Sequence, residues 1–121
     1  MSPDARAALE RARARLDRLD LYPRPVRIER VRVVHAPWFF RLPKLRRYHG
    51  YALRRTILLR QAPGQGASDD LATHELCHVW QMQHRPFRVF WAWLTTRYEE
   101  NPYELEARRA VALTREPPAA G

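Results

Sequence analysis

A helix over residues 69–84 is the feature that most restricts what this chain can fold into. Ser68 is a good N-cap residue, and Asp69 and Asp70 favour the positive end of a helix dipole. Pro86 ends the helix, because the residue before a proline avoids helical backbone angles. The rest of a chain of 121 residues therefore has to cover the apolar side of one long helix.

This helix carries the pattern His-Glu-x-x-His. At 3.6 residues per turn, His74 and His78 lie on one arc together with Gln81. The opposite arc is apolar and consists of Ala72, Leu76, Val79 and Trp80. Histidines four positions apart can bind one metal ion, and Glu75 stands beside them as a base for metal-bound water. The pattern predicts a Zn²⁺ site, and a solvated polar helix face is the plain alternative.

A zinc site of this kind needs a third protein ligand, and three residues are candidates. His84 has the spacing of the metzincin motif, but that motif needs a glycine where this chain has Gln81. Glu104 is a second candidate, although it could instead form a capping box with Asn101. Glu106 is the remaining alternative, on another side of the same predicted helix.

Two stretches carry a family resemblance: "HELCHVWQ" at 74–81 and "PYELEAR" at 102–108. With them the chain resembles the gluzincin group of zinc metallopeptidases, in particular the minimal gluzincins and related zincin-like domains. The resemblance implies a Zn²⁺ ion and four site residues. These are the metal ligands His74, His78 and Glu104 and the catalytic base Glu75.

The resemblance implies that the protein is a metallopeptidase that hydrolyses peptide bonds of a peptide or protein substrate with a metal-activated water. Glu75 would take a proton from that water and pass it to the leaving amine. Such peptidases bind substrate as an added strand at a sheet edge, for which residues 51–60 are available. The candidates for an oxyanion donor are His49, Tyr51, Tyr98 and Tyr103.

One departure from the group suggests a second function. The group usually has Asp or Asn where this chain has Arg108, so a contact that orients a ligand histidine is lost. The alternative function is therefore a catalytically inactive zincin-like domain that binds a protein or a membrane. Arg108 favours this alternative, whereas the presence of Glu75 favours an enzyme.

The remaining pattern predicts an α+β fold, with a small mixed or antiparallel sheet packed against the helix at 69–84 and C-terminal helices beyond it. We expect a single zincin-like domain over residues 1–116. Its parts are an N-terminal helix at 4–20, a sheet region at 26–61 with strands at 26–34 and 51–61, the helix at 69–84, and C-terminal helices at 87–114, followed by a disordered tail at 117–121. The aromatic residues expected to close the core between the last helices are Trp80, Phe87, Phe90, Trp91 and Trp93.

Charge and composition limit the partners. The net charge is +9, but the 22 basic residues include a single lysine, Lys44, and are spread over the whole chain. Such an excess of arginine over lysine, without a basic cluster, is more typical of a genome-wide codon bias than of a surface that binds phosphates. We therefore do not expect nucleic acid as the partner. Binding to a membrane surface is an alternative role for the aromatic segment 86–100 with its arginines. Without a signal peptide or an apolar run of about 20 residues, we expect a cytoplasmic protein, and the lone Cys77 is expected to be a small buried filler.

Overall fold

The computed structural model describes residues 2–41, 50–53, 56–59 and 68–115. The predicted tail at 117–121 and His49 lie outside the described residues. Along the chain the elements are α1 (Pro3–Leu16), β1 (Arg32–His35), the 3-10 turn η1 (Phe39–Arg41), β2 (Gly50–Leu53), β3 (Thr56–Leu59), α2 (Ser68–His84), α3 (Pro86–Thr95), the 3-10 turn η3 (Tyr98–Glu100) and α4 (Pro102–Thr114). The fold is α+β and mostly helical, which confirms the class expected from the sequence.

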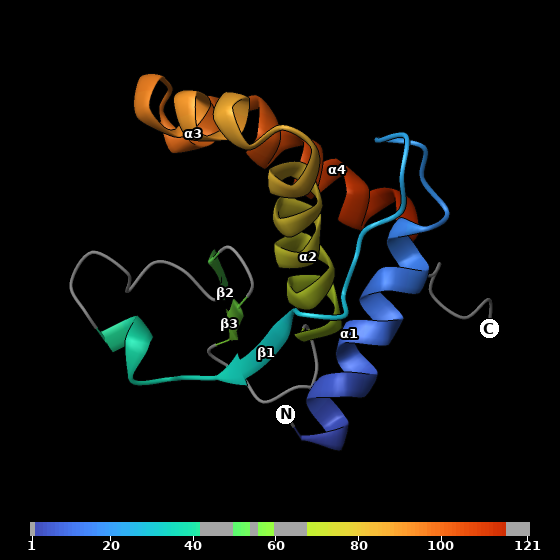
Figure 1. Ribbon diagram of the computed structural model, residues 1–121. Coiled ribbons are helices and arrows are strands. Elements are labelled where there is room, and N and C mark those ends of the chain that lie inside the picture. The colour runs from blue at the N-terminus through green and yellow to red at the C-terminus, as the bar shows by residue number, and fades with distance from the viewer. Residues whose placement is uncertain (1, 42–49, 54–55, 60–67, 116–121) are drawn as a thin grey trace, which may run out of the picture.

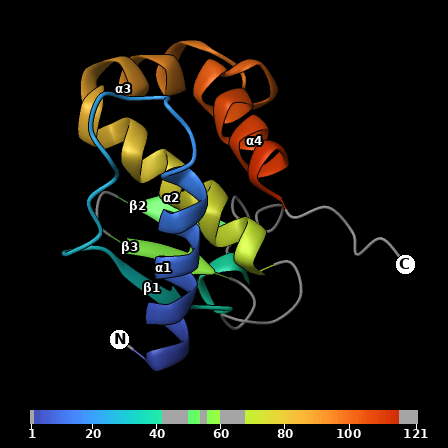
Figure 2. The ribbon, with the colours of Figure 1, turned by 90° about the vertical axis from the view of Figure 1, so that its right-hand side faces the viewer.

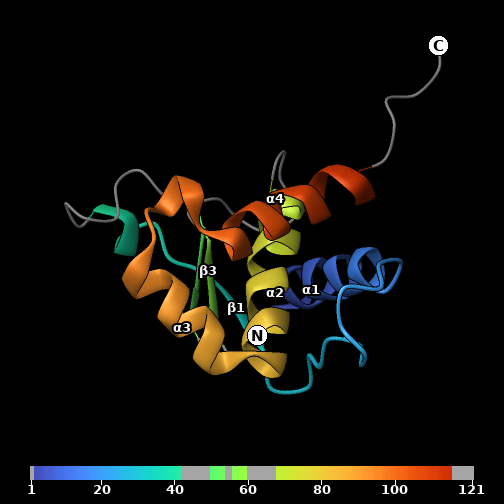
Figure 3. The same cartoon turned by 90° about the horizontal axis from the view of Figure 1, so that it is seen from above.

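Helix α2 runs through the middle of the molecule (Figure 1). The sheet lies on one side of it and α1 on the other, and α3 lies at its C-terminal end (Figures 1 and 3). α4 packs along α2, from Tyr103 beside Gln81 to the residue after the helix, Arg115, beside Asp70. α2 contains several of the most deeply buried side chains, including Leu76, Val79 and Trp80. The helix predicted at 69–84 is therefore the element around which the core is built.

The sheet has three strands in the order β1-β3-β2, with β3 in the centre. β1 pairs with β3 in parallel, with Val33 opposite Ile57, and β2 pairs with β3 antiparallel, with Ala52 opposite Ile57. Ile57 and Leu59 belong to the main core, whereas Leu58 points to the other face and packs with a smaller cluster. The sheet is thus small and mixed, one of the two forms that the sequence predicted.

α1 packs along α2 through small residues. Ala5, Ala8 and Ala12 are buried together with Leu9 and Leu16, and short side chains let the two helix backbones approach closely. Figure 2 shows α1 in front of the sheet and α2. The N-terminal helix therefore closes the side of α2 that faces away from β2.

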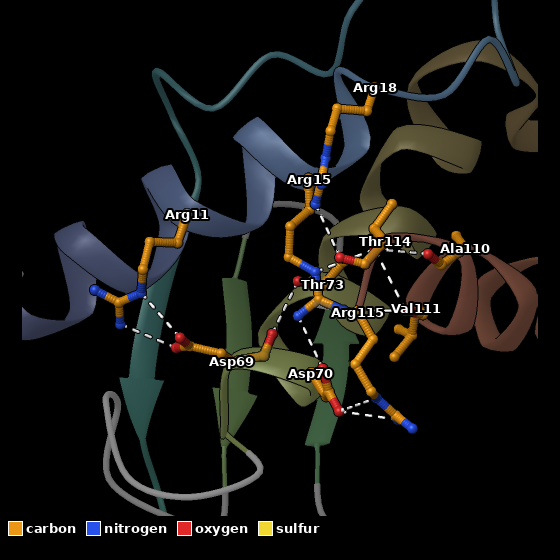
Figure 4. A network of polar contacts seen from close by, with 10 residues as sticks. All are labelled: Arg11, Arg15, Arg18, Asp69, Asp70, Thr73, Ala110, Val111, Thr114 and Arg115. Carbon is orange, nitrogen blue, oxygen red and sulfur yellow. Dashed lines mark hydrogen bonds and ion pairs between the residues drawn. The ribbon is translucent and has the colours of Figure 1, made fainter. Parts of the chain in front are cut away.

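A network of polar contacts joins the C-terminal half of α1 to the start of α2 and the end of α4 (Figure 4). The guanidinium of Arg15 donates to Asp70 Oδ1 at 2.8 Å, to Thr114 Oγ1 at 3.1 Å and to the Val111 carbonyl at 3.1 Å. Arg115 donates to the second oxygen of Asp70 at 3.0 Å, and Arg18 reaches the Thr114 carbonyl at 2.8 Å. These contacts pair arginines with the last carbonyls of one helix and with the acidic first turn of another.

The N-terminal helix and the first strand are shorter than expected. The helix predicted at 4–20 ends at Leu16, and leaving the helix there brings Tyr22 into the core, where its ring packs on Trp80. The strand predicted at 26–34 is shorter: Val26 and Ile28 are buried as expected, but a turn with Val31 N–H donating to the Ile28 carbonyl separates them from β1.

The strand predicted at 51–61 is two strands, β2 and β3, which pair with each other. A single apolar run does not reveal where a hairpin turns when no glycine or asparagine pair marks the turn. Residues 54–55 lie outside the described residues.

The prediction for the aromatic segment is wrong for four of its five residues, including Trp93, which is 42% exposed. Trp80 is buried, but Phe87 is 86% exposed, and Phe90 and Trp91 are 66% and 67% exposed. Only Val89 and Ala92 of α3 are buried. The reason is that α3 lies at the edge of the molecule and covers the end of α2 with a narrow face (Figures 1 and 3).

Candidate metal centre

α2 places two imidazole rings side by side. His74 and His78 are one helical turn apart, and their Nε2 atoms are 3.2 Å from each other. The two ring centroids are 4.9 Å apart, with the ring planes nearly perpendicular. Both rings therefore direct the same kind of nitrogen to one point.

α4 brings Glu104 to that point. Its side chain is only 1% exposed, and its two oxygens lie 2.9 Å from His74 Nε2 and 2.9 Å from His78 Nε2. Glu104 does not complete a capping box, because the Asn101 backbone N–H donates to the Tyr98 carbonyl at 3.4 Å, while Asn101 Oδ1 caps the helix by accepting from the Tyr103 backbone N–H at 2.9 Å. Glu104 is the predicted candidate that the structure brings to both histidines.

The donor set fits a transition-metal ion such as zinc. The ligand atoms of His74, His78 and Glu104 all lie within 4.8 Å of one another. Bonds of about 2.0–2.1 Å in a tetrahedral zinc site set neighbouring ligand atoms roughly 3.3 Å apart. The observed separations of 3.2 Å and 2.9 Å are close to that value. Two imidazoles and a carboxylate form a possible metal-binding group.

Gln81 determines which nitrogen of His78 faces the group. Its amide nitrogen donates to the Tyr103 carbonyl at 2.8 Å and to Glu106 Oε1 at 3.1 Å, so its oxygen faces His78. That oxygen lies 2.8 Å from His78 Nδ1, which must therefore carry the hydrogen. When His78 is neutral, the lone pair of Nε2 is left for a metal ion, the arrangement that metal-binding histidines have. When His78 is protonated instead, its Nε2–H donates to Glu104 Oε2 at 2.9 Å.

Electrostatics at the group keep Glu104 charged. Burial by itself would raise the pKa of this carboxyl, but hydrogen bonds from His74 and His78 hold it below its usual range. Burial would likewise lower the pKa of His78, but its contact with Glu104 and the charge of Glu75 raise it. A buried carboxylate and two imidazoles in this arrangement attract a cation, either a proton or a metal ion.

Glu75 is the second carboxylate near the group. It is buried in α2 directly after His74, and the pKa of its carboxyl is raised, mainly by burial. His78 and His74 partly offset this shift, whereas Glu104 adds to it, so Glu75 interacts with all three members of the group. This carboxylate is therefore a better proton acceptor than an exposed glutamate.

Two further side chains, Tyr98 and Arg108, form hydrogen bonds with Glu104. The hydroxyl of Tyr98 donates to Glu104 Oε1 at 3.1 Å, and Arg108 Nε donates to the same oxygen at 3.2 Å. The guanidinium of Arg108 also lies 5.5 Å from the centre of the Tyr98 ring. Trp93 of α3 contacts both His78 and Tyr98, with its ring centroid 6.0 Å from that of His78 and 5.9 Å from that of Tyr98. Sequence reasoning had named Tyr98 and Arg108, but not their contact with Glu104.

The other candidate ligands lie elsewhere among the described residues. His84 stacks on Tyr22, with ring centroids 5.2 Å apart, and its Nδ1 lies 3.2 Å from the Trp80 carbonyl. Glu106 accepts from the Tyr22 hydroxyl at 2.6 Å and from Gln81. Neither residue joins the metal-binding group. Cys77 is fully buried and burial raises the pKa of its thiol, as expected for a filler.

The role of Gln81 was missed, although a signal for it was present. Gln81 shares the arc of His74 and His78, and a residue three positions after a ligand histidine can reach its second ring nitrogen. The contact of Trp93 with His78 had no such signal, because it depends on how α3 folds back on α2.

Comparison with known proteins assigns no family to this chain. No protein-family model matches it, and neither a curated protein nor a solved structure is found to be similar to it. Within the part of the chain that the structure describes, no helix is both long and apolar enough to span a membrane. The described part of the chain has a mostly helical α+β fold with one possible His-His-Glu metal-binding group.

Proposed function

We propose that this protein is a zinc-dependent metallopeptidase of the gluzincin type. The observation that carries the proposal is the convergence of His74, His78 and Glu104, with the buried carboxylate of Glu75 beside them. A group that only stores or transports a metal has no need for a second buried carboxylate at this position. When bound, zinc would act as a Lewis acid and lower the pKa of water at the site toward neutrality.

Glu75 is the proposed catalytic base. It accepts a proton from water while the water oxygen bonds to the peptide carbonyl carbon, and it returns the proton to the nitrogen of the leaving amine. Burial favours the protonated form of Glu75 and so strengthens it as an acceptor. Gln81 keeps the lone pair of His78 Nε2 directed at the metal site throughout.

Peptide is the proposed substrate because an edge strand lies beside α2. β2 forms one edge of the described sheet, pairs there with β3, and packs on α2. An extended peptide could add to such an edge as a further strand, with main-chain hydrogen bonds that do not depend on its sequence. We therefore expect cleavage of unfolded polypeptides as well as short peptides.

The experiment is zinc analysis and a peptidase assay of the purified protein and of Glu75→Gln. We expect one zinc per chain in both proteins, cleavage of unfolded casein by the wild type, and a loss of at least about 100-fold in rate for Glu75→Gln. Glu99→Gln is the control, because Glu99 is exposed and outside the site. The proposal is wrong if Glu75→Gln cleaves casein as fast as the wild type, or if the wild type takes up no zinc.

One observation favours an inactive metal-binding domain instead. Arg108 contacts Glu104 Oε1 at 3.2 Å and so places a positive charge beside the site where a cation would bind. Such a charge weakens metal binding through like-charge repulsion, although the exposed half of the side chain is screened by water. The same experiment separates the two functions: an inactive domain binds zinc without any cleavage that depends on Glu75.

A further inference from the structure

Helix α3 presents four large apolar side chains to solvent. Phe87, Phe90, Trp91 and Leu94 are 86%, 66%, 67% and 64% exposed. Their spacing of three, four and seven positions puts them on one face of the helix, which we call the aromatic stripe. Exposed apolar surface of this size on a soluble domain marks an interaction site.

The stripe is the outer face of α3. The opposite face holds the two buried residues of the helix, Val89 and Ala92, and Trp93 beside them packs on His78 and Tyr98. α3 contacts α2 and α4 with this inner face and lies at the outer edge of the molecule (Figures 1 and 3). Among the described residues, the stripe therefore takes no part in the packing of α3 on the rest of the fold.

Basic residues surround the stripe. Arg88 lies on α3 itself, Arg85 caps its N-terminal end and Arg97 follows its C-terminal end, and all three side chains are exposed. No acidic residue occurs from Arg85 to Arg97, and the next ones are Glu99 and Glu100 in η3. A helix with an aromatic apolar face and arginines at its margins has the composition of one that lies in a membrane interface.

We propose that α3 binds the surface of an anionic lipid bilayer. The aromatic stripe enters the boundary between headgroups and acyl chains, while the three arginines stay at the level of the anionic headgroups. The net charge of +9 on the whole chain adds a long-range attraction to such a surface. This inference does not depend on the metal centre or on the proposed peptidase activity.

The size of the stripe favours a bilayer over a second copy of the chain. Since Phe and Trp side chains present roughly 150–250 Å² each, the exposed part of the stripe is on the order of 500 Å². A stable dimer buries about 800 Å² per partner and would bring the arginines of two copies together. A fluid anionic surface needs no matching shape and neutralises the same charges.

The test is co-sedimentation of the full chain with vesicles of phosphatidylcholine, alone or mixed with about 30% phosphatidylglycerol. We expect binding to the mixed vesicles only, and a loss of binding when salt rises from about 0.1 M to about 0.5 M. Trp91→Ser/Leu94→Ser should weaken binding at least tenfold, because it removes half of the stripe. Arg88→Gln should weaken it about fivefold.

Matched controls separate the stripe from general charge and hydrophobicity. Trp38→Ser/Leu113→Ser removes one exposed Trp and one exposed Leu elsewhere, and Arg109→Gln removes an exposed arginine of α4. Both should bind within about twofold of the wild type, and circular dichroism should show that all variants are folded. The inference is overturned by equal losses in test and control variants, by no binding to anionic vesicles, or by a dimer that Trp91→Ser/Leu94→Ser abolishes.

Discussion

Gln81 decides which nitrogen of His78 can bind a metal. Replacing it with leucine removes the acceptor of the Nδ1 hydrogen, so the ring can rotate or carry its hydrogen on Nε2 instead. Contacts of this kind are worth about 10-fold to 100-fold in metal affinity. We therefore expect Gln81→Leu to bind zinc about 10-fold to 100-fold more weakly, as measured by competition with a chromophoric chelator.

Gln83→Leu is the matched control for this prediction. Gln83 lies on the same helix and bonds to the backbone of Arg27 through both ends of its amide, away from the metal-binding group. Its loss should lower the free energy of unfolding by about 1 kcal/mol and leave zinc affinity within about twofold. Equal zinc affinities in both variants would show that Gln81 has no role in orienting His78.

At the residue scale, the sequence predicted the possible metal-binding group of His74, His78 and Glu104. It did not predict the contacts that other side chains make with these three residues. His74 and His78 were predictable because helix periodicity alone sets their distance. Glu104 needed the tertiary structure, because only the packing of α4 on α2 tells it apart from Glu106. The contact of Arg108 with Glu104 could have been predicted, since the two residues are four positions apart on one helix.

At the scale of elements, Arg15 connects three helices. Its side chain is only 14% exposed and contacts α2 at Asp70 and α4 at Thr114 and Val111 (Figure 4). Arg15→Met keeps the apolar stem but leaves Asp70 with Arg115 alone and removes both hydrogen bonds from Arg15 to α4, although the Val111 carbonyl still accepts from the Arg115 backbone N–H. We expect this change to lower the free energy of unfolding by about 2 kcal/mol, measured by urea denaturation.

Arg13→Met is the corresponding control on the same helix. Arg13 pairs with Asp17 at 3.7 Å, and both side chains are more than 40% exposed. Exposed pairs of this kind contribute little, so the free energy of unfolding should fall by less than about 0.5 kcal/mol. If both variants were equally stable, the network in Figure 4 would not hold the helices together.

The elements differ in how well the sequence predicts them. α4 begins directly after its capping residue Asn101, and α2 ends at His84, two residues before Pro86, so local chemistry fixes these limits. The strands are four residues long, and their pairing depends on distant segments of the chain. α3 was predicted as a helix, but its burial could not be predicted. A helix rich in aromatic residues has the same sequence pattern whether it lies inside a core or at a surface.

At the scale of the whole molecule, the proposed zinc ion would join α2 to α4. Two of its ligands come from one helix and the third from the other, so zinc should bind the folded chain far better than the unfolded one. At 100 times the dissociation constant, such binding adds about 2.7 kcal/mol to the free energy of unfolding. For a chain of this size we expect the melting temperature to rise by about 10 °C, measured by differential scanning fluorimetry.

This rise should disappear when the ligands are removed. His74→Ala/His78→Ala should melt at the same temperature with and without zinc, whereas His84→Ala should still respond, because His84 lies outside the metal-binding group. A similar rise in all three proteins would place the stabilising zinc at another site.

The contacts of Arg15 have a consequence for how the chain is made. Arg15 lies in α1, yet its partners Val111 and Thr114 lie 96 and 99 positions later. The apolar face of α1 can pack on α2 before then, but the contacts of Arg15 with α4 cannot form until Val111 and Thr114 have been made. Contacts so distant along the chain form slowly, so we expect the junction of α1, α2 and α4 to be among the last parts of the molecule to fold.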